Sequence, residues 1–173
     1  MSYTYDARAY REYFENDFTY LNGFRRNVHR FADRPAIQLA ETGENITYAD
    51  LGGRVDALAA GLIAAGVQPG DVVAYQLHNG PEFAELYLAT QAAGAVGAPM
   101  NFRLAAGETA YILSTTRPKV FVYDTSLGEV VATALEHATH VPEVLVAVGD
   151  GEPLAGRDGS TVLRYRDLPE PGG

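Results

Sequence analysis

The sequence predicts an α/β fold: a largely parallel sheet with helices on both faces, preceded by a helical N-terminal segment and a β-hairpin. Short apolar runs typical of buried strands alternate with segments of helical periodicity between residues 47 and 148. Glycine, proline and polar residues separate these segments at spacings that suit parallel strands joined by crossover helices. The chain has 173 residues, of which 47% are hydrophobic and 20% charged, and this is enough to bury one sizeable core.

The N-terminal segment, residues 6–31, has helical periodicity in two pieces. Its apolar positions are Tyr10, Tyr13 and Phe14 in the first piece and Phe24, Val28 and Phe31 in the second. Pro35 interrupts this pattern, and two strand-like runs, residues 36–40 and 45–48, then flank a polar turn. We therefore expect a helical collar followed by a β-hairpin.

The first long helix is expected to begin at a capping box formed by Thr47 and Asp50. The apolar side chains that follow share one helical face. They are Leu51, Val55, Leu58 and Leu62. Gly66 suits the left-handed position after the last turn, and Pro69 prevents the helix from continuing.

Strands and helices alternate beyond this helix. The expected strands are residues 72–77, 95–100, 120–123 and 144–148, and the expected helices are residues 79–94, 107–116 and 126–138. Asn79 and Ser126 are expected at the starts of their helices, where polar side chains commonly cap. Beyond Gly149 the chain is turn-rich, and only residues 161–163 suit a strand and 165–168 a short helical turn.

Three regions follow from this pattern. Residues 1–35 form the N-terminal helical collar, residues 36–150 the α/β subdomain, and residues 151–173 a turn-rich tail leading to an absent downstream region.

The composition excludes several classes of function. With 22 acidic and 13 basic residues the net charge is -9, so nucleic acid and anionic membranes are poor non-specific partners. The absence of cysteine excludes disulfides, thiolate catalysis and thiolate metal sites. Residues 1–13 lack the apolar core of a secretory signal, and no apolar run approaches a membrane span, so we expect a cytoplasmic protein. Lys119 is the only lysine and the only place for lysine chemistry.

Neither a phosphate-binding loop nor a serine nucleophile can be argued from the residues. The chain has no G-x-x-x-x-G-K-[ST] segment and no complete G-x-G-x-x-G after a strand. Gly94 and Gly97 are more simply explained by a helix end and by close backbone packing. A G-x-S-x-G elbow is also absent, and Ser114 and Ser126 lie at helix ends, where hydroxyls commonly cap.

Histidine offers two candidates. His137 and His140 have metal-ligand spacing, but Glu136 points to another face and the helix is ending, which favours a surface pair. His78 follows a strand at its carboxyl end, the edge at which ligands bind in open parallel sheets. The alternative for His78 is a neighbour of the helix cap at Asn79.

Arg103 is the strongest candidate for ligand contact. The segment Asn101–Leu104 leaves a buried strand at its carboxyl end, and the arginine carries a fixed planar charge that suits phosphate. The alternative is a structural arginine paired with an acidic side chain. No catalytic residue and no metal ligand is expected in the chain.

Four short motifs occur in order: Ile46–Leu51, Gly66–Ala74, Asn79–Phe83 and Gln91–Leu104. This succession resembles the N-terminal part of the adenylate-forming, or AMP-binding, acyl-CoA synthetases and ligases, in particular the fatty-acyl-CoA ligases. The resemblance implies a two-step reaction in the parent enzyme, in which a carboxylate attacks ATP to give acyl-AMP and a thiol then gives acyl-CoA. Asn101–Leu104 favours CoA ligases over the adenylation domains of peptide synthetases, which usually have aspartate and proline there.

The same resemblance assigns roles to residues and cofactors. Arg103 becomes a candidate contact for the phosphates of coenzyme A, because the arginine of the Asn-x-Arg-Leu motif lies near the CoA entry in acyl-CoA and aryl-CoA ligases. The chain departs from the family at Ala105–Gly107, where a threonine or serine commonly caps the next helix. ATP, Mg²⁺ and coenzyme A are the implied cofactors of the parent, and a carboxylic acid is its implied substrate.

The chain is expected to be an N-terminal fragment of such a ligase. It has no Ser/Thr/Gly-rich phosphate loop, and Lys119 matches no catalytic lysine of the family. We therefore expect the fragment alone to be inactive, to bind none of these cofactors tightly, and to form a homo-oligomer through exposed apolar surface. The rival hypothesis is a free-standing interaction or regulatory module that has the same fold and no chemistry.

Overall fold

The computed structural model describes residues 6–157 and 159–168. The chain forms two compact units, Met1–Gly52 and Gly53–Gly173. The hairpin therefore groups with the N-terminal helices, and the segment after residue 150 groups with the sheet, whereas the sequence pattern suggested boundaries near residues 35 and 150.

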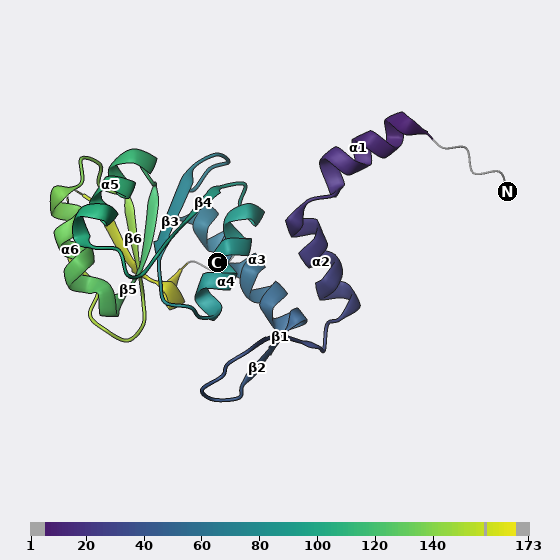
Figure 1. Cartoon of the computed structure of the whole chain (residues 1–173), viewed down its shortest axis with the longest axis horizontal. Coiled ribbons are helices and arrows are strands. Elements are labelled where there is room, and N and C mark those ends of the chain that lie inside the picture. The colour runs from purple at the N-terminus through teal and green to yellow at the C-terminus, as the bar shows by residue number, and fades with distance from the viewer. Residues whose placement is uncertain (1–5, 158, 169–173) are drawn as a thin grey trace. The chain divides into compact units, whose positions relative to one another are not determined.

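The first unit contains two helices and the hairpin (Figure 1). The elements are α1 (Ala7–Asp17), α2 (Tyr20–Arg30), β1 (Pro35–Gln38) and β2 (Asn45–Thr47). Asp6 accepts a hydrogen bond from the backbone of Arg8 and caps α1, and Thr19 accepts one from Asn22 and caps α2. The two strands are antiparallel, so the helical segment and the hairpin are confirmed. The side chain of Tyr10 lies outside the described residues.

The second unit is built on a five-stranded sheet with the strand order β4-β3-β5-β6-β7. The strands are β3 (Val72–Gln76), β4 (Val96–Met100), β5 (Val120–Asp124), β6 (Val144–Val148) and β7 (Thr161–Arg164). Every neighbouring pair is parallel. All residues of β6 are buried, which is why this strand reads as a continuous apolar run. The predicted parallel sheet is confirmed.

Helices cover both faces of this sheet. They are α3 (Tyr48–Ala64), α4 (Pro81–Ala92), α5 (Ala106–Thr116) and α6 (Gly128–His137). Figure 1 shows α5 and α6 on one side of the strands and α3 and α4 on the other. Alternate strand residues, among them Phe121, Tyr123 and Leu145, pack with Leu113 of α5 and Val131 of α6 in one apolar core.

Local signals at the ends of α3 act as expected. Thr47 Oγ1 accepts from the N–H of Asp50 at 3.1 Å, and Asp50 Oδ2 accepts from the N–H of Thr47 at 3.3 Å, which completes the capping box. At the other end Gly66 has a φ of 95°, and the N–H of Val67 donates to the carbonyl of Leu62 at 3.0 Å.

The expected cap of α4 at Asn79 is wrong. Gly80 is the N-cap residue and makes no side-chain cap, and Pro81 is the first helical residue. Proline suits this position because its missing N–H would have no partner inside the helix, which leaves one donor fewer to cap.

The start of α6 also differs from the prediction. A 3₁₀ turn, Thr125–Leu127, precedes the helix, which begins at Gly128 and not at Ser126. Asp124 Oδ1 accepts from the N–H of Ser126 at 2.9 Å, so the aspartate caps this turn and the serine hydroxyl remains available for other contacts.

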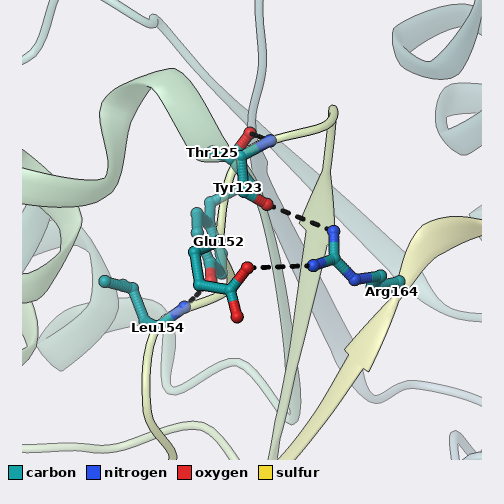
Figure 2. A network of polar contacts seen from close by, with 6 residues as sticks. Tyr123, Thr125, Glu152, Leu154 and Arg164 are labelled. Atoms are coloured by element: carbon teal, nitrogen blue, oxygen red, sulfur yellow. Dashed lines mark hydrogen bonds and ion pairs between the residues drawn. The ribbon is translucent and has the colours of Figure 1, made fainter.

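The C-terminal segment, expected to be turn-rich with a strand at residues 161–163 and a short helical turn at residues 165–168, contributes the edge strand β7 and a 3₁₀ turn, Tyr165–Asp167. Figure 2 shows how the loop before β7 is held to the sheet. The N–H of Leu154 donates to Tyr123 Oη at 2.7 Å, and Arg164 donates to the carbonyl of Gly151 at 3.1 Å. These bonds join residues that are distant in sequence, so periodicity alone gave no sign of them.

Candidate functional site

The carboxyl ends of β3, β4 and β5 lie next to one another in the sheet, at the edge where ligands bind in open parallel folds. His78 follows β3, the segment Asn101–Arg103 follows β4, and Ser126 follows β5. The structure therefore brings the two candidate binding residues, Arg103 and His78, to the same edge.

The side chains at this edge form a continuous row, which we call the edge row: Arg103, Phe102, His78 and Ser126. The guanidinium carbon of Arg103 lies 5.2 Å from the centre of the Phe102 ring. The Phe102 and His78 rings are 4.6 Å apart, and His78 Nε2 lies 3.1 Å from Ser126 Oγ. A cation over an aromatic face is attracted to it without losing its charge, so the row presents a positive group at one end.

Arg103 is exposed, and no carboxylate in residues 6–157 and 159–168 forms an ion pair with it. Arg54 and Arg164, by contrast, each pair with a glutamate. An arginine without an acidic partner can form charge-assisted hydrogen bonds to an anion at little desolvation cost. Among the described residues, the geometry therefore does not support the alternative of a structural arginine paired with an acid.

A pocket of about 320 Å³ adjoins the edge row. Its lining residues are Leu77, Asn79, Phe83, Pro99, Met100, Asn101 and Phe102. Most of these side chains are apolar, and two carry amides, so the pocket suits an apolar group with a polar end.

The helix after the edge row begins without a threonine or serine cap. Ala105 occupies the N-cap position and has no side-chain acceptor, but Glu108 Oε2 accepts from the N–H of Ala105 at 2.9 Å. The glutamate thus satisfies one of the free N–H groups by itself, and α5 begins at Ala106, one residue before the expected start.

A second polar cluster was not expected from the sequence. Tyr165 Oη donates to Glu85 Oε2 at 2.6 Å, and Arg54 lies 3.3 Å from Glu85 Oε1. Glu85 is only 5% exposed, so both partners are needed to compensate its charge. Burial, and then the charge of Glu85, raises the pKa of Tyr165 far above its ordinary value, so its hydroxyl stays a donor.

This cluster lines a pocket of about 370 Å³. Tyr165 and Glu85 are 80 residues apart in sequence, and neither belongs to a short motif. The one signal of this cluster in the sequence is that Glu85 lies among apolar residues in the middle of α4. A glutamate that is buried at such a position requires a partner.

The other candidate residues have structural surroundings. His137 is exposed at the end of α6, and His140 Nε2 lies 2.9 Å from the carbonyl of Pro118. No cluster of three or more His, Cys, Asp or Glu residues that could hold a metal occurs in the part of the chain that the structure describes. Within that part, no helix is long and apolar enough to cross a membrane.

Lys119 lies at the opposite, amino edge of the sheet. Its Nζ is 3.4 Å from Asp71 and 3.8 Å from Glu143. The N–H of Gln68 lowers the pKa of Asp71 most, and Lys119 lowers it further, against an opposing effect of burial. The lysine therefore joins the starts of three strands and has no place in the edge row.

Gly94 and Gly97 have the structural roles expected of them, a helix end and close backbone packing. Gly94 has a φ of 72° just after α4. A Cβ atom on Gly97 would lie 2.8 Å from Thr90 Oγ1, so only glycine allows β4 to approach α4 so closely.

Comparison with known proteins identifies the family of this chain. The pattern of the AMP-binding enzyme family matches residues 24–169. A feruloyl-CoA synthase from Amycolatopsis sp is 41% identical over 134 residues, which are 75% of this chain and 27% of that protein. Human long-chain fatty acid transport protein 1 is 34% identical over 129 residues, 75% of this chain and 20% of that protein.

Among solved structures, a protein assigned as a long-chain-fatty-acid CoA ligase from Rhodopseudomonas palustris superposes with a TM-score of 0.76 at 34% identity. The superposition covers 91% of this chain and 37% of that one, so the chain spans well under half the length of these relatives. Because the family pattern extends over most of the chain, including both the hairpin and the edge row, this protein belongs to the AMP-binding enzyme family.

Proposed function

We propose that this chain is the N-terminal part of an ATP-dependent carboxylate-CoA ligase, which forms acyl-AMP and then acyl-CoA. The observation that carries the proposal is the family match over residues 24–169, together with relatives that are named as CoA synthases and ligases. The parent is then an acid-thiol ligase that uses ATP, Mg²⁺ and coenzyme A, in the cytoplasm, where these cofactors are available.

Within this reaction Arg103 is the proposed contact for the phosphates of coenzyme A, and His78 is a weaker candidate beside it. The guanidinium at the carboxyl edge, which forms no ion pair with a carboxylate among the described residues, supports the role of Arg103. The ring contact with Phe102 supports a role for His78 in keeping the edge row in place. Neither residue is proposed to take part in bond making or breaking.

A fatty acid is the proposed carboxylate. The fatty-acid transport protein and the long-chain-fatty-acid CoA ligase among the relatives support this choice. The feruloyl-CoA synthase at 41% identity makes an aryl acid the competitor to include in any assay.

The 173 residues alone are proposed to be inactive. Activation of a carboxylate requires dense positive charge and N–H donors around the transferring phosphate, and the chain contains no glycine-rich phosphate loop and no lysine at the carboxyl edge. The test compares the 173-residue chain with the full polypeptide of its reading frame, in pyrophosphate exchange and in thioester formation with fatty and aryl acids.

Only the full polypeptide should be active in both assays. Acyl-adenylate formation by the purified 173-residue chain would refute the proposed inactivity. A reading frame that ends at Gly173, in a protein that binds no carboxylate, would instead favour the interaction module.

A further inference from the structure

A buried amide lies directly beneath the edge row. Gln76, the last residue of β3, is 0% exposed and is one of the few polar residues in the interior of the described chain. An amide removed from water is costly unless both its ends are hydrogen-bonded. The hydrogen-bond partners of Gln76 therefore indicate its structural role.

Both ends of the amide are bonded. Gln76 Nε2 donates to the carbonyl oxygen of Asn101 at 3.2 Å, and Gln76 Oε1 accepts from Thr109 Oγ1 at 3.3 Å. The backbone carbonyl can only accept, which fixes the orientation of the amide. The glutamine thus links β3, the end of β4 and helix α5.

The carbonyl that Gln76 binds is also the one that closes the turn carrying Arg103. The N–H of Leu104 donates to the same Asn101 oxygen at 3.2 Å. The side chain of Asn101 closes the turn a second time, because its Oδ1 accepts from the N–H of Arg103 at 2.9 Å. Residues 101–104 therefore form a turn with two internal hydrogen bonds and one anchor in the core.

We infer that Gln76 and Thr109 are positioning residues, which fix the turn 101–104 and thereby the guanidinium of Arg103 for its ligand. The exposed arginine side chain has many rotamers, and a fixed backbone lowers the entropy lost when it binds. The anchoring of the turn stands on the hydrogen bonds alone. Its effect on a nucleotide phosphate rests on the proposed function of Arg103.

The anchoring can be tested on the 173-residue chain by amide hydrogen exchange at Arg103 and Leu104. Thr109→Val keeps the shape of a fully buried side chain and leaves Gln76 Oε1 without its donor. We expect exchange at both amides to become about five- to a hundredfold faster, as for loss of one buried hydrogen bond. Gln76→Met removes both bonds and should have a larger effect.

The matched control is Thr116→Val in the same helix, whose hydroxyl bonds only to the carbonyl of Ile112. This substitution should leave exchange at Arg103 and Leu104 unchanged. If Thr109→Val also leaves both amides unchanged, or accelerates exchange equally throughout the chain, Thr109 does not position the turn and the inference is wrong. If Gln76→Met gives the same result, the turn has no anchor at Gln76 either.

The effect on the ligand is tested with the full polypeptide. Thr109→Val should raise the KM for coenzyme A about three- to tenfold and leave the adenylation half-reaction unchanged. A KM that responds to Arg103→Ala but not to Thr109→Val would overturn the positioning role and leave the proposed function standing. If neither variant changes the KM for coenzyme A, Arg103 does not contact coenzyme A, and positioning of its guanidinium has no effect on this ligand. This conclusion would hold even if hydrogen exchange shows that the turn is anchored.

Discussion

Two kinds of single residue lead to predictions: an exposed charged residue at the carboxyl edge, and tyrosines whose hydroxyls are shielded from water. Arg103 is the former, with an aromatic neighbour and no acidic partner among residues 6–157 and 159–168. Tyr75 and Tyr123 are buried and Tyr165 is half-buried, and burial raises the pKa of each hydroxyl. Each group leads to a separate prediction.

In the full polypeptide, Arg103→Ala should remove one charge-assisted phosphate interaction, of about 1.5–3 kcal/mol. The KM for coenzyme A should rise accordingly, while the adenylation half-reaction stays nearly unchanged because only the second step uses the thiol. Arg103→Lys should rescue poorly if the contact is bidentate. Steady-state kinetics of both half-reactions check this.

Arg117→Asn provides the control, because it removes the same charge after α5, away from the edge row. Arg117 has a φ of 48°, a conformation that asparagine tolerates. Equal loss of both half-reactions in Arg103→Ala, or simple loss of stability, would make Arg103 a structural residue.

The buried tyrosines predict that stability falls in alkali. In the folded chain the pKa of Tyr75 is raised to about 12, and the pKa values of Tyr123 and Tyr165 are also raised. Unfolded tyrosine titrates near pH 10, so above this pH the unfolded chain binds fewer protons and is favoured. The stabilising difference is fully present below about pH 10 and is lost as the pH rises toward the folded values. Urea unfolding between pH 8 and pH 11 measures this slope.

Tyr75→Phe should make the slope shallower and cost little stability at pH 7. Its hydroxyl is buried without a hydrogen-bond partner among the described residues, so its removal takes away an unsatisfied group. Stability that stays constant from pH 8 to pH 11 would contradict the assignment of raised pKa values.

Helix α3 shows at the scale of an element how packing overrides helix propensity. It contains two adjacent glycines, Gly52 and Gly53. A Cβ atom on Gly52 would lie 2.9 Å from Val28 Cγ1 on α2, while a Cβ atom on Gly53 would meet nothing within 4 Å. The close approach of Val28 thus requires a glycine at position 52, whereas no neighbouring atom requires one at position 53.

Gly53→Ala should stabilise the chain by about 1 kcal/mol, because alanine is the better helix former at an exposed position. Gly52→Ala gains the same propensity but must displace a β-branched side chain, at a cost of about 1–3 kcal/mol. We therefore expect Gly52→Ala to be the less stable variant by that difference, measured by urea unfolding. Two variants of equal stability would show that the Val28 side chain moves aside freely.

At the scale of the whole molecule, exposed apolar surface leads us to expect that the chain associates with itself. Several large aromatic side chains are exposed among the described residues of the first unit: Tyr13, Phe14, Phe18, Tyr20 and Phe31. The sheet of the second unit ends in β4 and β7, and open strand edges can pair with another chain. A homo-oligomer is therefore proposed for the 173-residue chain.

Sedimentation velocity should show association that increases with protein concentration. Phe18 is 57% exposed, and Phe18→Ser should weaken association if the N-terminal aromatic surface mediates it. Val96→Lys on the edge strand β4 should do so if strand edges mediate it. A strict monomer at high concentration would contradict the proposal.

The sequence by itself determined the fold class, the hairpin, most element boundaries and the family. The fold features depend on apolar periodicity and on signals that act between near neighbours, such as the Thr47 capping box and the left-handed Gly66. The family depends on a resemblance carried by four ordered motifs between residues 46 and 104. The same local signals misplaced two helix starts. In both cases a neighbouring residue, Pro81 or Asp124, served the helix end better than the expected cap.

Only the tertiary structure decided which side chains meet. His78 and Ser126 are 48 residues apart, Gln76 and Thr109 are 33 apart, and Tyr165 and Glu85 are 80 apart. Their contacts depend on strand order and helix placement, and the alternation of strands and helices does not encode either one. A polar residue in an apolar run, such as Gln76, indicates that the residue has a hydrogen-bond partner, because an unpaired buried amide is costly. The identity of that partner depends on how elements distant in the sequence pack together, and only the tertiary structure shows this packing.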